Sequence, residues 1–232
     1  SGGGDRPASG RPGEAAMKAY FERSNRFLEL PLDLRPRVLL LAALLLLAPA
    51  YLAPLWKITM FAPQYPGGLR MQIYSYKLEG GNGGQDINEI NILNHYIGMK
   101  ELSTAEFTEF KWIPFVVGAL ALVFLRASVL GRMGTLVDVF VLYLYFGLFS
   151  LWSFGYKLYA YGHNLDPKAS VKVEPFMPPL FGGKKLANFE VYSYPAAGSY
   201  ALAGVALVLA AALFYAWREA RSEQAAEARS AG

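Results

Sequence analysis

The sequence predicts an all-α transmembrane fold, a four-helix membrane bundle with a small α+β extracytoplasmic cap built from two long loops. Hydrophobic residues make up 54% of the 232 residues. They gather in four runs, each close to the about 20 residues that a helix needs to cross a bilayer. Tryptophan or tyrosine stands at the borders of these runs, as in the aromatic belts of membrane proteins. These borders favour membrane spans over buried helices of a soluble protein.

The predicted spans divide the chain into nine segments. The spans are residues 37–56, 112–129, 136–154 and 200–217, and the two long loops are 57–111 and 155–199. A short loop, 130–135, lies on the same side as the terminal segments 1–36 and 218–232. The Gly- and Pro-rich start of segment 1–36 predicts disorder, followed by an amphipathic stretch. No small-residue cleavage site follows the first run, so we expect an anchor and not a cleaved signal peptide.

The distribution of positive charge predicts the orientation. Lysine and arginine are denser on the side of the termini, and arginines adjoin the span ends there: Arg35, Arg37, Arg126, Arg132, Arg218 and Arg221. Positive residues are retained in the cytoplasm. We therefore expect a multi-pass protein of the bacterial inner membrane with both termini cytoplasmic and both long loops periplasmic. The net charge of +4 suits anionic lipid and indicates no nucleic-acid surface.

The two long loops contain patterns of regular structure. Alternating side chains predict strands in "LRMQIYSYKLEG" (69–80), "SVKVEPF" (170–176) and "NFEVYSYP" (188–195), and "MPPLFGGKK" (177–185) predicts a turn. Residues 86–102 predict a helix, with Asp86 as N-cap and Glu89 completing a capping box. Neither loop can bury a good core alone, so we expect the two loops to pack together.

His95 and Met99 of that helix are the first candidate metal ligands. Residues four apart share a helical face, and imidazole and thioether groups both suit copper, thioethers especially Cu(I). His163 and Met177 lie in the other long loop, on the same side of the membrane. The candidate ligands are therefore His95, Met99, His163 and Met177, with Cu(I) as the candidate cofactor. Two alternatives remain open: a packed polar seam with Met99 filling a gap, and a surface that recognises a partner protein.

Catalytic signatures are missing from the sequence. It contains no phosphate-binding loop, no G-x-S-x-G and no H-E-x-x-H, and the centres of the spans carry no charge. We therefore predict no catalytic residues, no proton pump and no voltage sensor.

Two stretches carry a resemblance to a known group of proteins. They are "INILNHYIGMKEL" and "YGHNLDPKASVKVEPFMPPLFGGKKLANFEVYSYPAAGSY". Both resemble segments of small multi-spanning membrane proteins encoded beside nitrous oxide reductase in some bacteria. The resemblance covers the two loops, while the spans agree only in number and hydrophobicity. It implies an accessory protein that serves a periplasmic copper enzyme, with His95, Met99, His163 and Met177 in a metal-related role.

The predicted function is that of a non-catalytic membrane accessory protein, supporting copper handling or assembly of a periplasmic metalloenzyme. Its expected partners are the lipid bilayer and a periplasmic or membrane protein, in a homo- or hetero-oligomer. The alternative is a structural or docking subunit of a respiratory or photosynthetic membrane complex. A small transporter would need oligomers, because four spans alone form no pathway.

Overall fold

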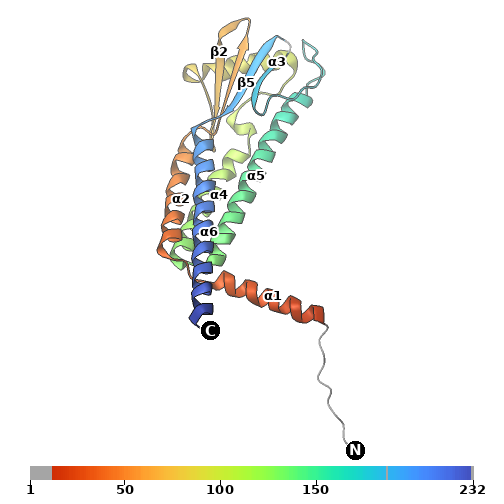
Figure 1. Cartoon of the computed structure of the whole chain (residues 1–232). Helices are drawn as coiled ribbons and strands as arrows, with labels where there is room; N and C mark the ends of the chain where they lie inside the picture. Colours follow the sequence, from red (N-terminus) through yellow and green to blue (C-terminus); the bar gives the residue numbers. More distant parts are fainter. Residues whose placement is uncertain (1–11, 187, 231–232) are drawn as a thin grey trace, which may run out of the picture.

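The computed structural model describes residues 12–186 and 188–230, and it places a five-stranded antiparallel sheet at one end of a bundle of long helices (Figure 1). The helices are α1 (Pro12–Glu29), α2 (Leu34–Leu52), α3 (Gln85–Ile97), α4 (Glu109–Leu130), α5 (Met133–His163) and α6 (Ala197–Ser230). The strands are β1 (Trp56–Ala62), β2 (Tyr65–Ile73), β3 (Leu78–Gly80), β4 (Gly182–Leu186) and β5 (Phe189–Pro195). Short 3₁₀ turns occupy Asn82–Gly84 and Thr104–Glu106.

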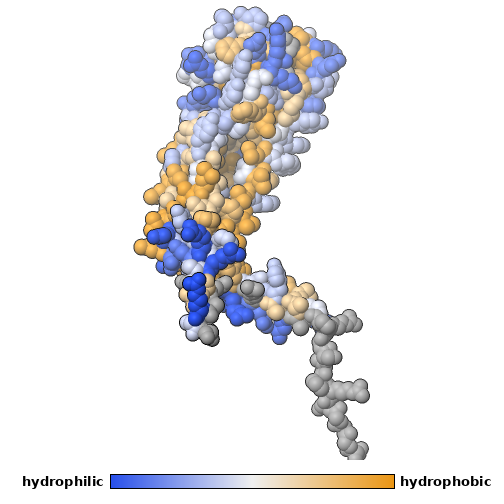
Figure 2. Space-filling view, viewed as in Figure 1, coloured by the Kyte–Doolittle hydropathy of each residue, from blue (hydrophilic) through white to orange (hydrophobic). Residues whose placement is uncertain are grey.

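Four helices are long and apolar enough to cross a membrane, namely α2, α4, α5 and residues 197–222 of α6. Figure 2 shows a hydrophobic surface over these helices, with hydrophilic surface at the cap and at the opposite end. Four helices of membrane-spanning length and composition, together with the small antiparallel sheet, agree with the predicted fold class and suggest a multi-pass membrane protein. The identity of the membrane and the orientation of the termini stay predictions.

The bundle is packed most closely along α2 and α6, which lie side by side over most of their length. Both helices bury small residues, including Ala43 and Ala50 on α2 and Ala212 and Ala216 on α6. Small side chains allow the backbones of neighbouring membrane helices to approach closely.

Helices α4 and α5 bury residues against this pair mainly in the halves that adjoin the turn between them. The fully buried residues of α4 begin at Leu120 and lie toward its C-terminal end. Along α5, which the structure describes from end to end, no residue between Tyr143 and Gly162 is fully buried. Figure 1 shows α5 leaning away from α2 and α6 toward the cap. The bundle is therefore closed at the end far from the cap and opens toward the cap.

The sheet joins the two long loops into one unit. Its strand order is β3-β2-β1-β5-β4, so β1 from the first loop pairs with β5 from the second. Helix α3 packs against this sheet and buries Ile90 with Ile58, Met71 and Val191. This pairing confirms that the two loops pack together.

Two strand predictions need correction. The predicted strand 69–80 is two strands, because residues 74–77 form a turn in which Tyr74 N–H donates to Lys77 O (2.9 Å). The turn is attached to α2 by Ser75, whose hydroxyl donates to Tyr51 O (3.1 Å). No strand forms at 170–176, because the backbone there bonds to helix ends: Val171 N–H donates to Tyr96 O (2.9 Å). The predicted turn at 177–185 includes most of β4.

The helix at 86–102 begins and ends differently from the prediction. Gly84 is the N-cap, and Asp86 is buried in the first turn, where its carboxylate accepts from Arg70 N–H (2.8 Å) and Asn82 Nδ2 (2.7 Å). Glu89 accepts from Gln85 Nε2 (2.9 Å) and from the Tyr65 hydroxyl, so it forms no capping box. Both carboxylates instead attach the helix to the sheet and its turn.

The N-terminal segment contains a helix that overlaps only the end of its Gly- and Pro-rich start, for which disorder was predicted. Residues 1–11 lie outside the described residues, and α1 begins at Pro12. Helix α1 extends sideways from the end of the bundle that is far from the cap (Figure 1). Phe27 packs on the bundle core, while Met17, Tyr20 and Phe21 are exposed.

Candidate functional site

The divergence of α4 and α5 leaves a cavity of about 330 Å³ between the cap and the adjoining half of the bundle. We call this cavity the chamber. Its walls come from all four spans, from β1, β2 and β5, and from α3. On α4 the lining runs from Glu109 to Leu120, which is about 16 Å along a helix. Leu120 and Tyr143 line its bundle end, and Ile90 and Asn94 line its cap end.

The chamber is lined almost wholly by aliphatic and aromatic side chains. Two of the tryptophans, Trp56 and Trp112, are in its wall. Trp56 is held by its indole N–H, which donates to Ser193 Oγ (2.7 Å), and by Phe154, whose ring centroid lies 5.1 Å away. Such a lining suits a ligand that is largely apolar.

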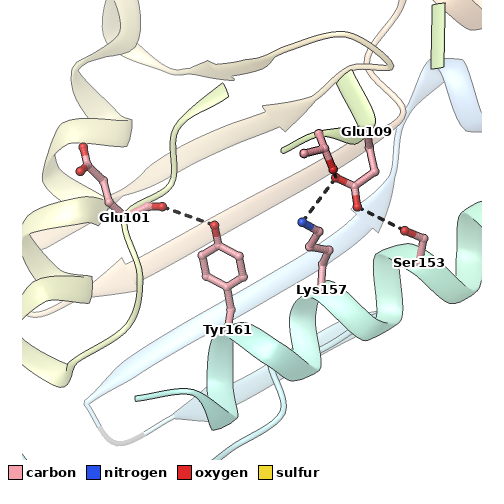
Figure 3. A network of polar contacts seen from close by, with 6 residues as sticks. Glu101, Glu109, Ser153, Lys157 and Tyr161 are labelled. Atoms are coloured by element: carbon pink, nitrogen blue, oxygen red, sulfur yellow. Dashed lines mark hydrogen bonds and ion pairs between the residues drawn. The ribbon is translucent and has the colours of Figure 1, made fainter. Parts of the chain in front are cut away.

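The few charged groups of the wall pair with one another (Figure 3). Lys157 Nζ lies 3.4 Å from Glu109 Oε2, and Ser153 Oγ donates to Glu109 Oε1 (3.4 Å). The Tyr161 hydroxyl donates to Glu101 O (3.3 Å). This pairing neutralises the wall where α4 begins and connects α5 to the segment before α4.

Asn94 is the exception among the buried polar side chains. The side chain is 2% exposed, and its Nδ2 has no hydrogen-bond partner anywhere in residues 12–186 and 188–230. The other buried polar side chains, Ser75, Asp86, Ser128 and Ser193, all form hydrogen bonds. A buried donor without an acceptor costs about 1–3 kcal/mol. Asn94 lines the chamber, so the chamber is where an acceptor could reach it.

Asn94 was missed in the sequence, although a signal was present. It lies four residues after Ile90 and three before Ile97, on the apolar stripe that α3 buries. A lone polar residue on such a stripe must find a partner inside the protein or in a ligand. The residues chosen as candidates instead were His95 and Met99, which we had placed on the neighbouring face of the helix.

The premise that His95 and Met99 share a helical face is wrong. Helix α3 ends at Ile97, and Gly98 adopts a left-handed conformation with φ of 78°. Met99 N–H then donates to Asn94 O (2.9 Å), as in a Schellman motif. Met99 therefore lies beyond the helix and lines the chamber, whereas His95 is exposed in an open depression beside Tyr96.

The other two candidate ligands are placed in still other settings. His163 ends α5, and its ring stacks on Tyr159 at 3.8 Å while Nδ1 donates to Tyr159 O (2.9 Å). Met177 lies in the loop before β4, where its carbonyl accepts from Lys184 Nζ (3.1 Å). In the described part of the chain, no three His, Cys, Asp or Glu side chains are placed to hold a metal ion. A copper site that uses His95, Met99, His163 and Met177 stays a prediction.

No known protein family, curated protein or solved structure matches this chain. The resemblance to proteins encoded beside nitrous oxide reductase stays a prediction. The chamber is therefore the feature of the protein that points to a function.

Proposed function

We propose that the protein is a non-catalytic multi-pass membrane accessory protein that holds one lipid-like molecule in the chamber. The observation that carries this proposal is the cavity itself, about 330 Å³, apolar and located between helices that are long and apolar enough to cross a membrane. The bilayer supplies apolar molecules at this depth. The volume is at the lower end of the range for small-molecule sites, so it suits a single chain or ring and not a two-chain lipid.

A binding role agrees with the chemistry of the wall. Glu109 and Lys157 neutralise each other, and the remaining lining offers apolar contact. The predicted inner-membrane location, cytoplasmic termini and periplasmic cap belong to the same proposal. Copper handling and docking to a respiratory complex remain separate predictions from the sequence.

Tryptophan fluorescence tests the proposal, because the four tryptophans divide into two pairs. Trp56 and Trp112 line the chamber, while Trp152 and Trp217 are 64% and 40% exposed on the outer surface of the helices. The variant Trp152→Phe/Trp217→Phe keeps only the chamber pair. The reverse variant, Trp56→Phe/Trp112→Phe, keeps only the outer pair and serves as the control.

Each purified full-length variant is titrated in detergent with single-chain lipids brominated in the tail, because bromine quenches tryptophan on contact. We expect saturable quenching of the chamber pair at about one lipid per protein. The outer pair should be quenched in proportion to the lipid content of the micelle, without saturation. Proportional quenching of both pairs would refute a chamber site.

A further inference from the structure

The unpaired amide of Asn94 indicates the polar chemistry of the ligand. Its Nδ2 has less than 1 Å² of exposed surface and no acceptor within the described residues. Asn91, on the same helix, shows the usual arrangement: its amide donates to Leu102 O (3.0 Å) and accepts from Leu102 N–H (2.7 Å). Asn94 has no such partner for Nδ2, and the residue belongs to the wall of the chamber.

We propose that the chamber ligand is a single-chain lipid with a carbonyl oxygen, and that this oxygen accepts a hydrogen bond from Asn94 Nδ2. This inference rests on the proposed function and adds the chemical class of the ligand. A carbonyl satisfies the buried donor without bringing a further donor that would need its own acceptor. The carbonyl lies at the cap end, beside α3, and the chain extends toward Leu120 and Tyr143 in the bundle.

The hydrogen bond from Asn94 determines which molecules bind in the chamber, because the burial of apolar surface does not distinguish one lipid chain from another. Lipid tails are as apolar as the lining of the chamber, so moving a chain from the bilayer into the chamber gains little from the hydrophobic effect. A hydrogen bond made in an apolar site has no competing water. Asn94 is therefore the selective element, and the aromatic and aliphatic walls supply shape.

The carbonyl can belong to either of two sources, a fatty-acyl group or the ring of a long-chain quinone. The two differ in shape and share the acceptor. The aromatic rings of Trp56, Phe107 and Phe110 line the chamber and would contact a flat quinone ring, whereas an acyl chain needs no such ring. The experiment has an arm for each source.

The test measures binding of three probes to the protein that keeps only the chamber tryptophans. The probes are a brominated fatty-acid methyl ester, a brominated alkane of the same length and a benzoquinone with an isoprenoid tail. Each is titrated into the reference protein, into Asn94→Leu and into the matched control Asn91→Leu. Leucine has the same branching and the same number of side-chain heavy atoms as asparagine, although it is bulkier, and it neither donates nor accepts.

We expect the reference protein to bind the ester or the quinone more tightly than the alkane. Asn94→Leu should lose about five- to tenfold in affinity for the preferred carbonyl probe and nothing for the alkane. Asn91→Leu should keep the preference for the carbonyl. Without added lipid, Asn94→Leu should melt at a higher temperature than the reference, because it removes an unpaired buried donor, and Asn91→Leu should melt lower.

Either of two results overturns the carbonyl inference while leaving the chamber site intact. One is an alkane that binds as tightly as both carbonyl probes, and the other is an Asn94→Leu protein with an undiminished carbonyl preference. If no probe gives saturable quenching, the proposed function fails together with the inference. A preference for ester over quinone, or the reverse, supports the inference and identifies the source.

Discussion

Filling the chamber from α5 should weaken ligand binding strongly without harming the fold. Gly147 lines the chamber, and a Cβ atom placed on it meets no atom within 4 Å. Gly155 lies two turns later on the same helix and is equally open, yet it is not part of the lining. Gly147→Phe is therefore the test variant, and Gly155→Phe is its matched control.

The expected loss of affinity follows from the atoms displaced. A phenylalanine side chain adds about seven carbon atoms, which take the place of about seven ligand atoms. At about 0.3 kcal/mol per non-hydrogen atom, this displacement costs about 2 kcal/mol, or roughly thirtyfold in affinity. Leucine at the same position adds about four atoms and should cost roughly sevenfold.

The thermal stability of the two Phe variants should not fall along with the ligand affinity. Replacing glycine by phenylalanine within a helix gains at most about 0.5 kcal/mol of helix propensity, so both Phe variants should melt at or above the wild-type temperature. Binding is measured by quenching of Trp56 and Trp112, and stability by thermal unfolding in the same detergent. Equal affinity in Gly147→Phe and Gly155→Phe would refute the assignment of the chamber as the binding site.

Three further predictions concern the scaffold of the chamber. The Tyr65 hydroxyl donates to Glu89 and holds the pKa of that carboxyl below its ordinary value, so the contact stabilises the cap above the ordinary carboxyl pKa and is lost as the pH falls through the lowered pKa. On acidification the unfolding temperature should therefore fall more steeply in wild type than in Tyr65→Phe, and parallel curves would contradict this. Gly162→Ala would make a Cβ clash with Phe176 O, and thermal unfolding should show a loss of about 1–3 kcal/mol, whereas an unchanged protein would show that this loop does not pack on α5. Arg37 donates to Ser128 O (2.8 Å) and Val129 O (2.5 Å). Arg37→Lys should therefore lower the free energy of unfolding by about 1.5 kcal/mol although the charge is retained, and unfolding in denaturant beside wild type measures this loss.

The spans could be predicted from the sequence because hydrophobicity over a membrane-length window is a local property. Their ends could not be predicted as well. The third span was expected to stop at residue 154, but α5 continues to His163 because Lys157 pairs with Glu109 and Tyr161 stacks on Phe107. A charged residue ends a hydropathy run without ending a helix.

The strands of the cap depended on partners far away in the sequence. Strand β5 was predicted from its alternation, whereas β1 follows directly after the first span and was not predicted. Strand β1 forms because it lies between β2 and β5, and β5 is more than a hundred residues away. The segment 170–176 had a strand pattern but lacks a strand partner, since its backbone bonds to α3 and α5.

The chamber itself had no local signature, because it results from how far α4 and α5 diverge.

One error at the candidate site could have been avoided. Gly98 stands between His95 and Met99, and glycine is the commonest residue just beyond a helix end. Applying that rule would have ended α3 before Met99 and removed the shared face on which the copper hypothesis was built.

Native mass spectrometry of the full-length protein, purified from membranes in a mild detergent, tests the central claim most directly. The account predicts that wild type and Gly155→Phe retain one single-chain carbonyl lipid per protein, and that Gly147→Phe, whose side chain occupies the chamber, retains none. Wild-type protein without a retained lipid, or the same lipid retained equally by Gly147→Phe, would contradict it.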